Sequence, residues 1–306
     1  MDTRTPLHIK TISEYHRLVN LPKPQHPLIS LSRFEDMQYK PGQSPRAIVH
    51  NFYSIALKKS FHAKLRYGQQ EVDFDGGTLL FMSPMQVISA DIPVGETVNH
   101  TGWLLLVHPD LLWHTNLASK IRQYEYFSYK VSEALHLSDD EEQMIVGIMH
   151  NIGQEYQVRI DNHSQDVIVA QLELLLTYAE RFYQRQFITR RASSHYIVDQ
   201  FEELLNSYFK SGELPLSGIP TVTYIADALN LSPNYLSRLL KTLTGQSTKQ
   251  FIIGKVVELA KEKLTTTDLS MNEIAYALGF EHPQSFNKLF KSKTSLSPLQ
   301  FRNSFN

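Results

Sequence analysis

The segment Leu236-Ser237-Arg238-Leu239-Leu240-Lys241 returns 50 residues later as Phe286-Asn287-Lys288-Leu289-Phe290-Lys291. Further upstream, Ile225-Ala226 returns 49 residues later as Ile274-Ala275. Repetition at a nearly fixed period indicates that one supersecondary unit is present more than once. The C-terminal region is therefore expected to contain two copies of the same small helical structure.

The first copy has the pattern of a helix, a tight turn and a second helix. Apolar spacing predicts a helix over 222–229, and Asn230 follows as the turn. Ser232 is a favourable N-cap, and Pro233 suits the first helical position, where a missing N–H costs nothing. This arrangement is typical of a helix-turn-helix, whose second helix enters the DNA major groove.

The second copy carries equivalent signals. Ser270 and Glu273 form a capping box, Gly279 suits the helix end, and a second helix is expected from Pro283 to about 291. A connecting helix is expected over 248–264 and would hold the two units apart. Recognition helices in successive major grooves lie about 34 Å apart.

Polar side chains occupy the outward positions of both second helices. Arg pairs with guanine, and Asn or Gln with adenine, so seven residues are candidates for base contacts: Asn234, Ser237, Arg238, Gln284, Ser285, Asn287 and Lys288. Phosphate contacts add affinity without sequence choice, and four residues are candidates for them: Lys241, His282, Lys291 and Lys293. A helical bundle with solvated charges is the alternative interpretation, which the duplication disfavours.

Charge is distributed unevenly along the 306 residues, whose net charge is −1. Residues 219–306 contain ten Lys or Arg and six Asp or Glu, hence +4, which leaves −5 for the rest. A modest positive bias in the C-terminal region suits a protein that finds specific DNA sites without binding everywhere.

Composition narrows the class of protein. The length suggests about two domains, and the absence of cysteine excludes disulfides and thiolate chemistry. The polar segment 1–10 does not resemble a signal peptide, and no apolar run reaches the roughly 20 residues of a membrane span. A soluble cytoplasmic protein without a membrane partner is expected.

The N-terminal region, to about residue 110, is expected to be β structure. Short aliphatic and aromatic runs alternate with turn signals, as in a sandwich or barrel: 28–34, 48–57, 61–67, 78–82, 86–90 and 103–108. Helices are expected at 142–157, after the capping box of Ser138 and Glu141, and at about 164–187. The wide apolar face of the latter can pack against the β region, against a partner chain, or both. A polar linker is expected over 185–194, followed by a helix over 195–210.

Aromatic residues of the β region can line a ligand pocket, although core packing is their commoner role: Phe52, Tyr53, Phe61, Tyr67 and Trp103. Arg46 and Arg66 are possible anchors for an anionic ligand. No H-x-H pair occurs, so no metal triad is expected. No nucleophile elbow, phosphate-binding glycine loop or His-Glu metal helix occurs, so we expect neither an enzyme nor a cofactor.

The C-terminal motifs resemble those of the AraC/XylS family of bacterial transcription regulators, over about residues 200–302. The matching motifs are Ile225-Ala226-x-x-Leu229-x-Leu231-Ser232, Tyr235 to Gly245, Ile274-Ala275-x-x-Leu278-Gly279-Phe280, Phe286 to Lys291, and Leu296 to Arg302. Three positions depart from the family pattern: Ser295 replaces Gly, His282 replaces an Asp or Ser cap, and Pro283 replaces a polar contact residue. The first 110 residues resemble, more weakly, the cupin-like sensor barrel of that family.

This resemblance implies an α+β protein with a cupin-like β-barrel, a helical dimerisation hairpin, and an all-α domain holding two helix-turn-helix units. The expected sensor and dimerisation domain covers 1–188, and the DNA-binding domain covers 194–306. The implied partners are a double-stranded DNA operator, a small-molecule effector, a second copy of the chain and, for an activator, RNA polymerase. Two alternatives stay open: a ligand-independent DNA-binding regulator, and a cupin-type enzyme fused to a DNA-binding module.

Overall fold

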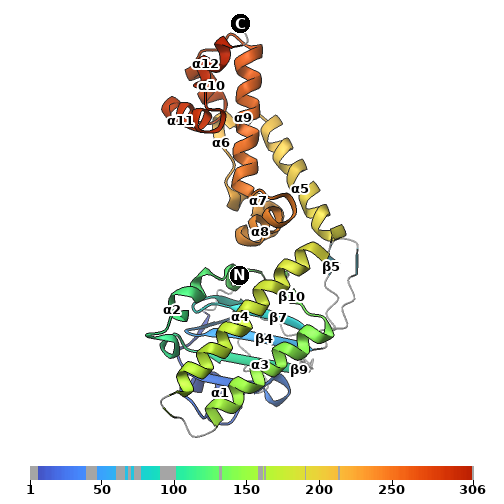
Figure 1. Cartoon of the computed structure of the whole chain (residues 1–306), viewed down its shortest axis with the longest axis vertical. Coiled ribbons are helices and arrows are strands. Elements are labelled where there is room, and N and C mark those ends of the chain that lie inside the picture. Colours follow the sequence, from blue (N-terminus) through green and yellow to red (C-terminus); the bar gives the residue numbers. More distant parts are fainter. Residues whose placement is uncertain are drawn as a thin grey trace. The chain divides into compact units, whose positions relative to one another are not determined.

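The computed structural model describes residues 6–38, 47–59, 66–67, 70–71, 77–89, 101–130, 133–157, 161, 163–189, 191–212 and 214–304. The chain divides into two compact units, Met1–Gln186 and Phe187–Asn306. The first is a mixed α+β unit and the second is helical (Figure 1). No helix in the described ranges is both long and apolar enough to cross a lipid bilayer.

A five-stranded antiparallel sheet forms the centre of the first unit. Its strands, in spatial order, are β10 (Leu135–His136), β7 (Thr78–Met82), β4 (Tyr53–Lys59), β9 (Thr101–Val107) and β2 (Ile29–Arg33). A second sheet contains β1 (Leu7–Ile9), β3 (Ala47–His50) and β8 (Val87–Ser89), and a small hairpin pairs β5 (Arg66–Tyr67) with β6 (Gln70–Glu71). These sheets are open in the described residues, so the closed cupin-like barrel stays a prediction.

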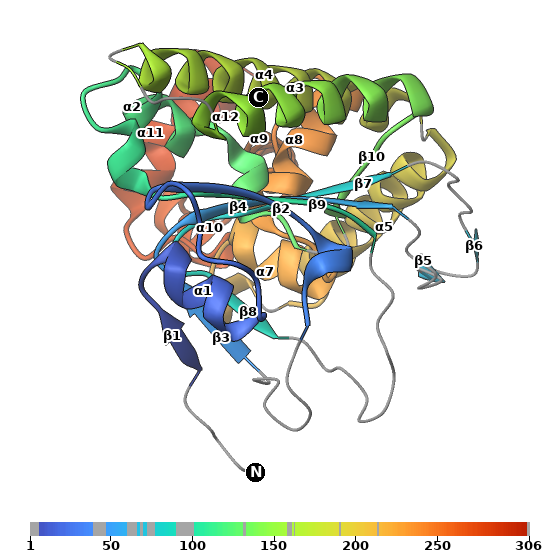
Figure 2. The same cartoon turned by 90° about the horizontal axis from the view of Figure 1, so that it is seen from below.

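Two long helices, α3 (Asp139–Gln157) and α4 (Ser164–Thr189), cover one face of the five-stranded sheet (Figure 2). The Tyr156 hydroxyl of α3 accepts a hydrogen bond from the Leu31 N–H of β2 at 2.7 Å. Gly153 permits this close packing, because a Cβ there would lie 2.9 Å from a methyl group of Leu31. The predicted helices 142–157 and 164–187 are confirmed with slightly longer bounds.

The opposite face of the sheet packs against α1 (Ile12–Leu18) and the three-stranded sheet (Figure 2). The helix α1 was not predicted from the sequence; it begins with a capping box between Thr11 and Glu14. The single strand expected over 48–57 is wrong: the chain leaves β3 and enters β4, which belongs to the other sheet. The change of sheet cannot be recognised from an uninterrupted apolar pattern.

Short helical segments follow β9 in the first unit. They are the 3-10 helices η2 (Pro109–Leu112), η3 (Ile121–Gln123) and η4 (Glu125–Ser128), with α2 (Leu117–Lys120) between η2 and η3. Another 3-10 helix, η1 (Phe34–Asp36), follows β2. The residues Tyr126 and Phe127 of η4 are buried, and both pack against Phe81 of β7. These segments close one end of the aromatic core beneath α4.

The boundary between the two units lies within α4. The polar linker expected over 185–194 is helical at its described positions, because α4 continues to Thr189 and α5 (Arg191–Lys210) begins at Arg191. Arg185 donates to Glu141 at 3.0 Å, and Gln186 accepts from the His136 N–H at 2.8 Å. These polar residues therefore anchor the helix, which their polarity alone did not indicate.

Candidate nucleic-acid interface

The first helix-turn-helix unit consists of α7 (Val222–Ala228) and α8 (Pro233–Thr244). The Thr221 side chain caps α7, and the Ser232 side chain caps α8 by accepting a backbone N–H three residues later. Between the helices, Asn230 takes a left-handed conformation with φ 56°. The turn predicted from the sequence is therefore present.

The second unit repeats this geometry with α10 (Met271–Ala277) and α11 (Pro283–Thr294). Ser270 and Glu273 form the predicted capping box at the start of α10. Gly279, with φ 79°, takes the left-handed position that Asn230 has in the first unit. Both units therefore turn between their helices in the same way.

The exits of the two second helices also match. Gly245 and Ser295 cap α8 and α11 in the left-handed conformation, with φ 76° and 65°. Ser247 and Ser297 then open the next helices, α9 (Thr248–Thr266) and α12 (Pro298–Asn303), each with a capping box to a Gln. Ser295 adopts the strained conformation without the glycine that normally relieves it.

The helix α9 joins the two units. Its 19 residues span about 28 Å at ~1.5 Å per residue. The guanidinium of Arg302 donates to the Leu264 carbonyl at 3.1 Å and to the Thr267 carbonyl at 3.4 Å, at the C-terminal end of α9. A cation at this end of α9 satisfies free carbonyls and complements the helix dipole. The Arg302 side chain therefore stabilises the C-terminal end of the connecting helix.

Each unit has an apolar core built from equivalent positions. The first core includes five residues that are almost fully inaccessible: Ile225, Ala226, Leu236, Leu239 and Leu240. The second includes the counterparts of four of them, together with Leu278: Ile274, Ala275, Phe286 and Phe290. Leu289, the counterpart of Leu239, is half-buried. The inward positions predicted from helical spacing are confirmed, and the remaining faces of α8 and α11 carry the polar residues.

The outer face of α11 is open to solvent. Five candidate contact residues on this helix are exposed: Gln284, Ser285, Asn287, Lys288 and Lys291. They combine amide and hydroxyl groups with two cations, the side chains that contact base edges and phosphates. This surface therefore has both kinds of group that a duplex requires.

The outer face of α8 is less uniform. Asn234 and Lys241 are exposed, whereas Ser237 and Arg238 are half-buried. The Ser237 hydroxyl lies 3.1 Å from the hydroxyl of Thr248, which is fully buried at the start of α9. The side chain of Ser237 therefore helps to join α8 to α9, a contact that helical spacing did not reveal.

A buried aromatic pair also distinguishes α8 from α11. Tyr235 packs edge-to-face against Phe187, with ring centroids 5.2 Å apart, and both rings are buried. The equivalent position in α11 is Ser285, which is exposed. The first unit therefore uses for packing a position that the second presents to solvent.

Lys293 lies apart from the other cations of α11. It lines a groove of about 380 Å³ that is formed mainly by α9, together with Val257, Glu258 and Lys261. The polar side chains of Gln246 and Gln250 line the same groove. The structure thus associates Lys293 with α9 rather than with the outer face of α11.

The N-cap of α11 is weak, as the sequence suggests. His282 is exposed and its side chain makes no capping hydrogen bond. We expect His282→Ser to stabilise the second unit by about 0.5–1 kcal/mol, because a hydroxyl can accept a free N–H of the first turn. Chemical denaturation would measure the change, and Ser232→Ala, which removes the working cap of α8, should have the opposite sign. An unchanged midpoint for His282→Ser would contradict this explanation.

Two aromatic candidates for a ligand pocket have packing roles. Phe52 is fully buried and stacks on His50 at a centroid distance of 4.5 Å. Trp103 is half-buried and lies beneath the guanidinium of Arg33, 5.4 Å from the ring centroid. Phe61 lies outside the described residues, and the side chain of Tyr67 is likewise not described.

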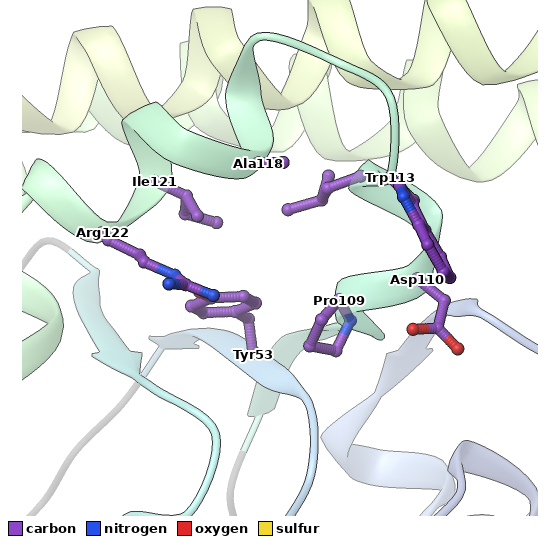
Figure 3. Close-up of a pocket in the computed structure, with 8 residues that line it drawn as sticks. Tyr53, Pro109, Asp110, Trp113, Ala118, Ile121 and Arg122 are labelled. Atoms are coloured by element: carbon purple, nitrogen blue, oxygen red, sulfur yellow. The ribbon is translucent and has the colours of Figure 1, made fainter.

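Tyr53 is the aromatic candidate that the structure associates with a cavity. It lines a space of about 160 Å³ in the first unit, together with residues of η2, α2 and η3 (Figure 3). Sequence analysis did not identify its neighbours Trp113 and Arg122, because they follow β9 in a segment without regular periodicity.

Two helix-turn-helix units joined by one helix, with polar outer faces, define a double helix-turn-helix domain of the DNA-binding class. A family model described as "Helix-turn-helix domain" matches residues 225–304. Residues 225–304 therefore form a helix-turn-helix domain of the AraC type.

Relatives with similar sequences are named as regulators. The Msm operon regulatory protein of Streptococcus mutans is 28% identical over 130 residues, which cover 42% of this chain and 44% of that protein. The uncharacterized transcriptional regulatory protein YesN of Bacillus subtilis is 37% identical over 78 residues, covering 25% of this chain and 21% of that protein. The matched segments thus span less than half the length of either relative. Their names agree with the expectation that the chain is not an enzyme.

A solved structure is similar to the same region. The C-terminal domain of AraT, a response regulator from Geobacillus stearothermophilus, is 30% identical and covers 35% of this chain and 84% of that chain, with a TM-score of 0.32.

Proposed function

We propose that this protein is a sequence-specific DNA-binding transcription regulator whose N-terminal unit responds to a small effector. The observation that carries the proposal is the duplication of the helix-turn-helix geometry, down to its caps and left-handed turns. Two such units on one connecting helix can read two stretches of one DNA face. The net charge of +4 over 219–306 supports attraction to the duplex.

The candidate residues divide by role in this proposal. Base contacts are assigned to the outward residues Asn234, Ser237 and Arg238 of α8, and to Gln284, Ser285, Asn287 and Lys288 of α11. Phosphate contacts are assigned to Lys241, His282 and Lys291, and to Lys293 from its position beside α9. The base contacts assigned to α11 have the strongest support, because all four of those side chains are exposed.

Residues 1–188 are proposed as a cupin-like sensor and dimerisation domain, and 194–306 as the DNA-binding domain. An effector would favour one conformation of the chain, and the change in population would alter operator binding or the contact with RNA polymerase. The cavity beside Tyr53 in the first unit supports a sensor that binds a small molecule.

Selection of DNA from a random pool tests the regulator proposal. The purified chain should enrich two short motifs about one helical turn apart, at a stated salt concentration. The Lys288→Ala variant, which changes only the α11 face, should lose preference in one motif and retain it in the other. Absence of any enrichment, with and without a cell extract as a source of effector, would contradict sequence-specific binding.

A homodimer through α3 and α4 is the proposed assembly. Exposed residues of α4 follow the 3-4 spacing of a helix–helix seam, at Val167, Ala170, Leu174 and Thr177. On α3, Met144 is also exposed and a Cβ on Gly147 would meet open space, which suits close approach of a second helix. This face is therefore apolar enough to associate.

We expect Leu174→Glu to raise the dimer dissociation constant at least tenfold, because a carboxylate in an apolar seam loses its hydration. Sedimentation equilibrium would measure the constant. The matched control is Gln200→Glu, which adds the same charge to an exposed position of α5. A monomeric unmodified chain, or equal constants for both variants, would contradict the proposed seam.

A further inference from the structure

The cavity beside Tyr53 lies between the first residue of β4 and the segment 109–122 (Figure 3). Its volume is about 160 Å³, and its apolar walls come from Pro109, Leu112, Ala118 and Ile121. A cavity of roughly 150 Å³ holds a molecule the size of benzene. The site thus suits a compact organic group and excludes a long acyl chain.

A cation and a hydroxyl lie together on one side of this cavity. Arg122 extends from η3 towards Tyr53 (Figure 3). Burial raises the pKa of the Tyr53 hydroxyl, and the nearby positive charge of Arg122 partly offsets this rise. In the described ranges, no carboxylate forms an ion pair with Arg122. Arg122 is therefore an exposed cation at the cavity wall with no ion-pair partner among the residues that the structure describes.

The other side of the cavity carries an exposed aromatic residue and a carboxylate. Trp113 is 65% exposed although it lines the cavity, which is unusual for a ring of that size. Asp110 lies on this side, away from Arg122 (Figure 3), and its carboxylate is 3.4 Å from Nδ1 of His108. The Asp110 side chain is 59% exposed, so water solvates its charge. Arg122 is therefore the group of the cavity wall that can bind an anion.

We propose that this cavity binds a small monocarboxylate with a compact apolar body. The carboxylate accepts hydrogen bonds from the Arg122 guanidinium, whose planar fork matches its two oxygens, and from the Tyr53 hydroxyl. The apolar body fills the space between Ile121 and Pro109, and Trp113 covers it. The role of such an acid as the effector of the regulator rests on the proposed function. The binding of the acid to this cavity does not depend on that function.

The position of Trp113 provides a direct measurement. The protein has two tryptophans, so a Trp103→Phe variant reports on Trp113 alone. Cyclohexanecarboxylate is a suitable probe, because its body is close to benzene in size and does not absorb at the excitation wavelength of indole. We expect a saturable change in fluorescence with this acid, and at least tenfold weaker binding of cyclohexanecarboxamide, which has the same shape without the charge.

Variants of the polar side assign the contact. In the Trp103→Phe background, Arg122→Met should weaken binding of the acid at least tenfold, and Tyr53→Phe should weaken it several-fold. Arg17→Met is the matched control, since Arg17 is an exposed arginine on α1 and should leave binding unchanged. Asp110→Asn should not weaken binding of the acid, because it removes a negative charge from the cavity wall.

Three results would overturn the proposal: no saturable change with the acid, equal binding of the acid and the amide, or undiminished binding by folded Arg122→Met. The amide comparison does not depend on the folding of any Arg122 variant. DNA selection with the same preparation separates the two claims. If the chain binds specific DNA but not the acid, the proposed acid site is refuted and the proposed regulator function is retained. If it binds the acid but not specific DNA, the acid site is retained and the regulator function is refuted.

Discussion

Replacement of Arg238 by alanine is expected to weaken operator binding by about 1–3 kcal/mol and to relax the preference for one base. Arg238 lies in the second turn of α8, where a guanidinium can pair with both acceptors of guanine in the major groove. Binding titrations against the selected site and its single-base variants would measure both effects. The loss should be largest on the selected base and nearly absent on its substitutes.

Lys291→Ala is the matched control for Arg238→Ala. Lys291 is exposed in the last turn of α11 and is assigned to phosphate. Its loss should weaken binding to all sequences about equally and reduce the slope of affinity against salt by about one. An equal loss on every sequence for both variants would refute the assignment of Arg238 to a base.

Gly279→Ala is expected to destabilise the second helix-turn-helix unit by ~2–5 kcal/mol, from the left-handed backbone and from steric overlap together. The φ of Gly279 is 79°, and a Cβ there would lie 2.6 Å from the Leu214 carbonyl oxygen and 2.9 Å from the Cα of Gly218. These atoms belong to the backbone around α6 (Leu214–Ser217), so no side chain can move aside. Urea denaturation followed by helical circular dichroism would measure the loss.

Two other glycines separate the causes. Gly245 has a similar φ of 76°, but a Cβ there would meet nothing within 4 Å, so alanine should cost only ~1–2 kcal/mol. Gly254 lies within α9 in open space, and alanine there should stabilise the protein by ~0.5–1 kcal/mol. Equal losses at Gly279 and Gly245 would show that the contact with α6 does not constrain this turn.

The C-terminal fold could be predicted because local signals agree there with packing. Ser232, Pro233 and Gly245 each have a conformational role that depends on neighbouring residues in the chain, and the structure bears out each role. Duplication adds an independent check, because each helix is predicted separately in both copies and a wrong assignment would have to occur in both. The outward positions of α11 follow from the same periodicity.

Other features depend on contacts between residues far apart in the chain. Tyr235 occupies a helical position next to the outward face, and it is buried where it packs against Phe187, 48 positions earlier. Ser237 joins α9 through Thr248 for a similar reason. In the N-terminal unit, the apolar run 48–57 contains two strands because they pair in different sheets. Periodicity describes one element at a time and does not predict which distant residues or strands will contact each other.

The passage of α4 through the boundary between the units constrains how such a chain can be recombined. Gln186 bonds to the first unit, and the next residue, Phe187, packs on Tyr235 of the second. Phe187 thus belongs to the second unit, although most of α4 belongs to the first. A fragment or chimaera that takes the second unit from residue 194 onward would therefore lack the Phe187 ring that packs on Tyr235, so an exchange of units in this chain has to be made before Phe187.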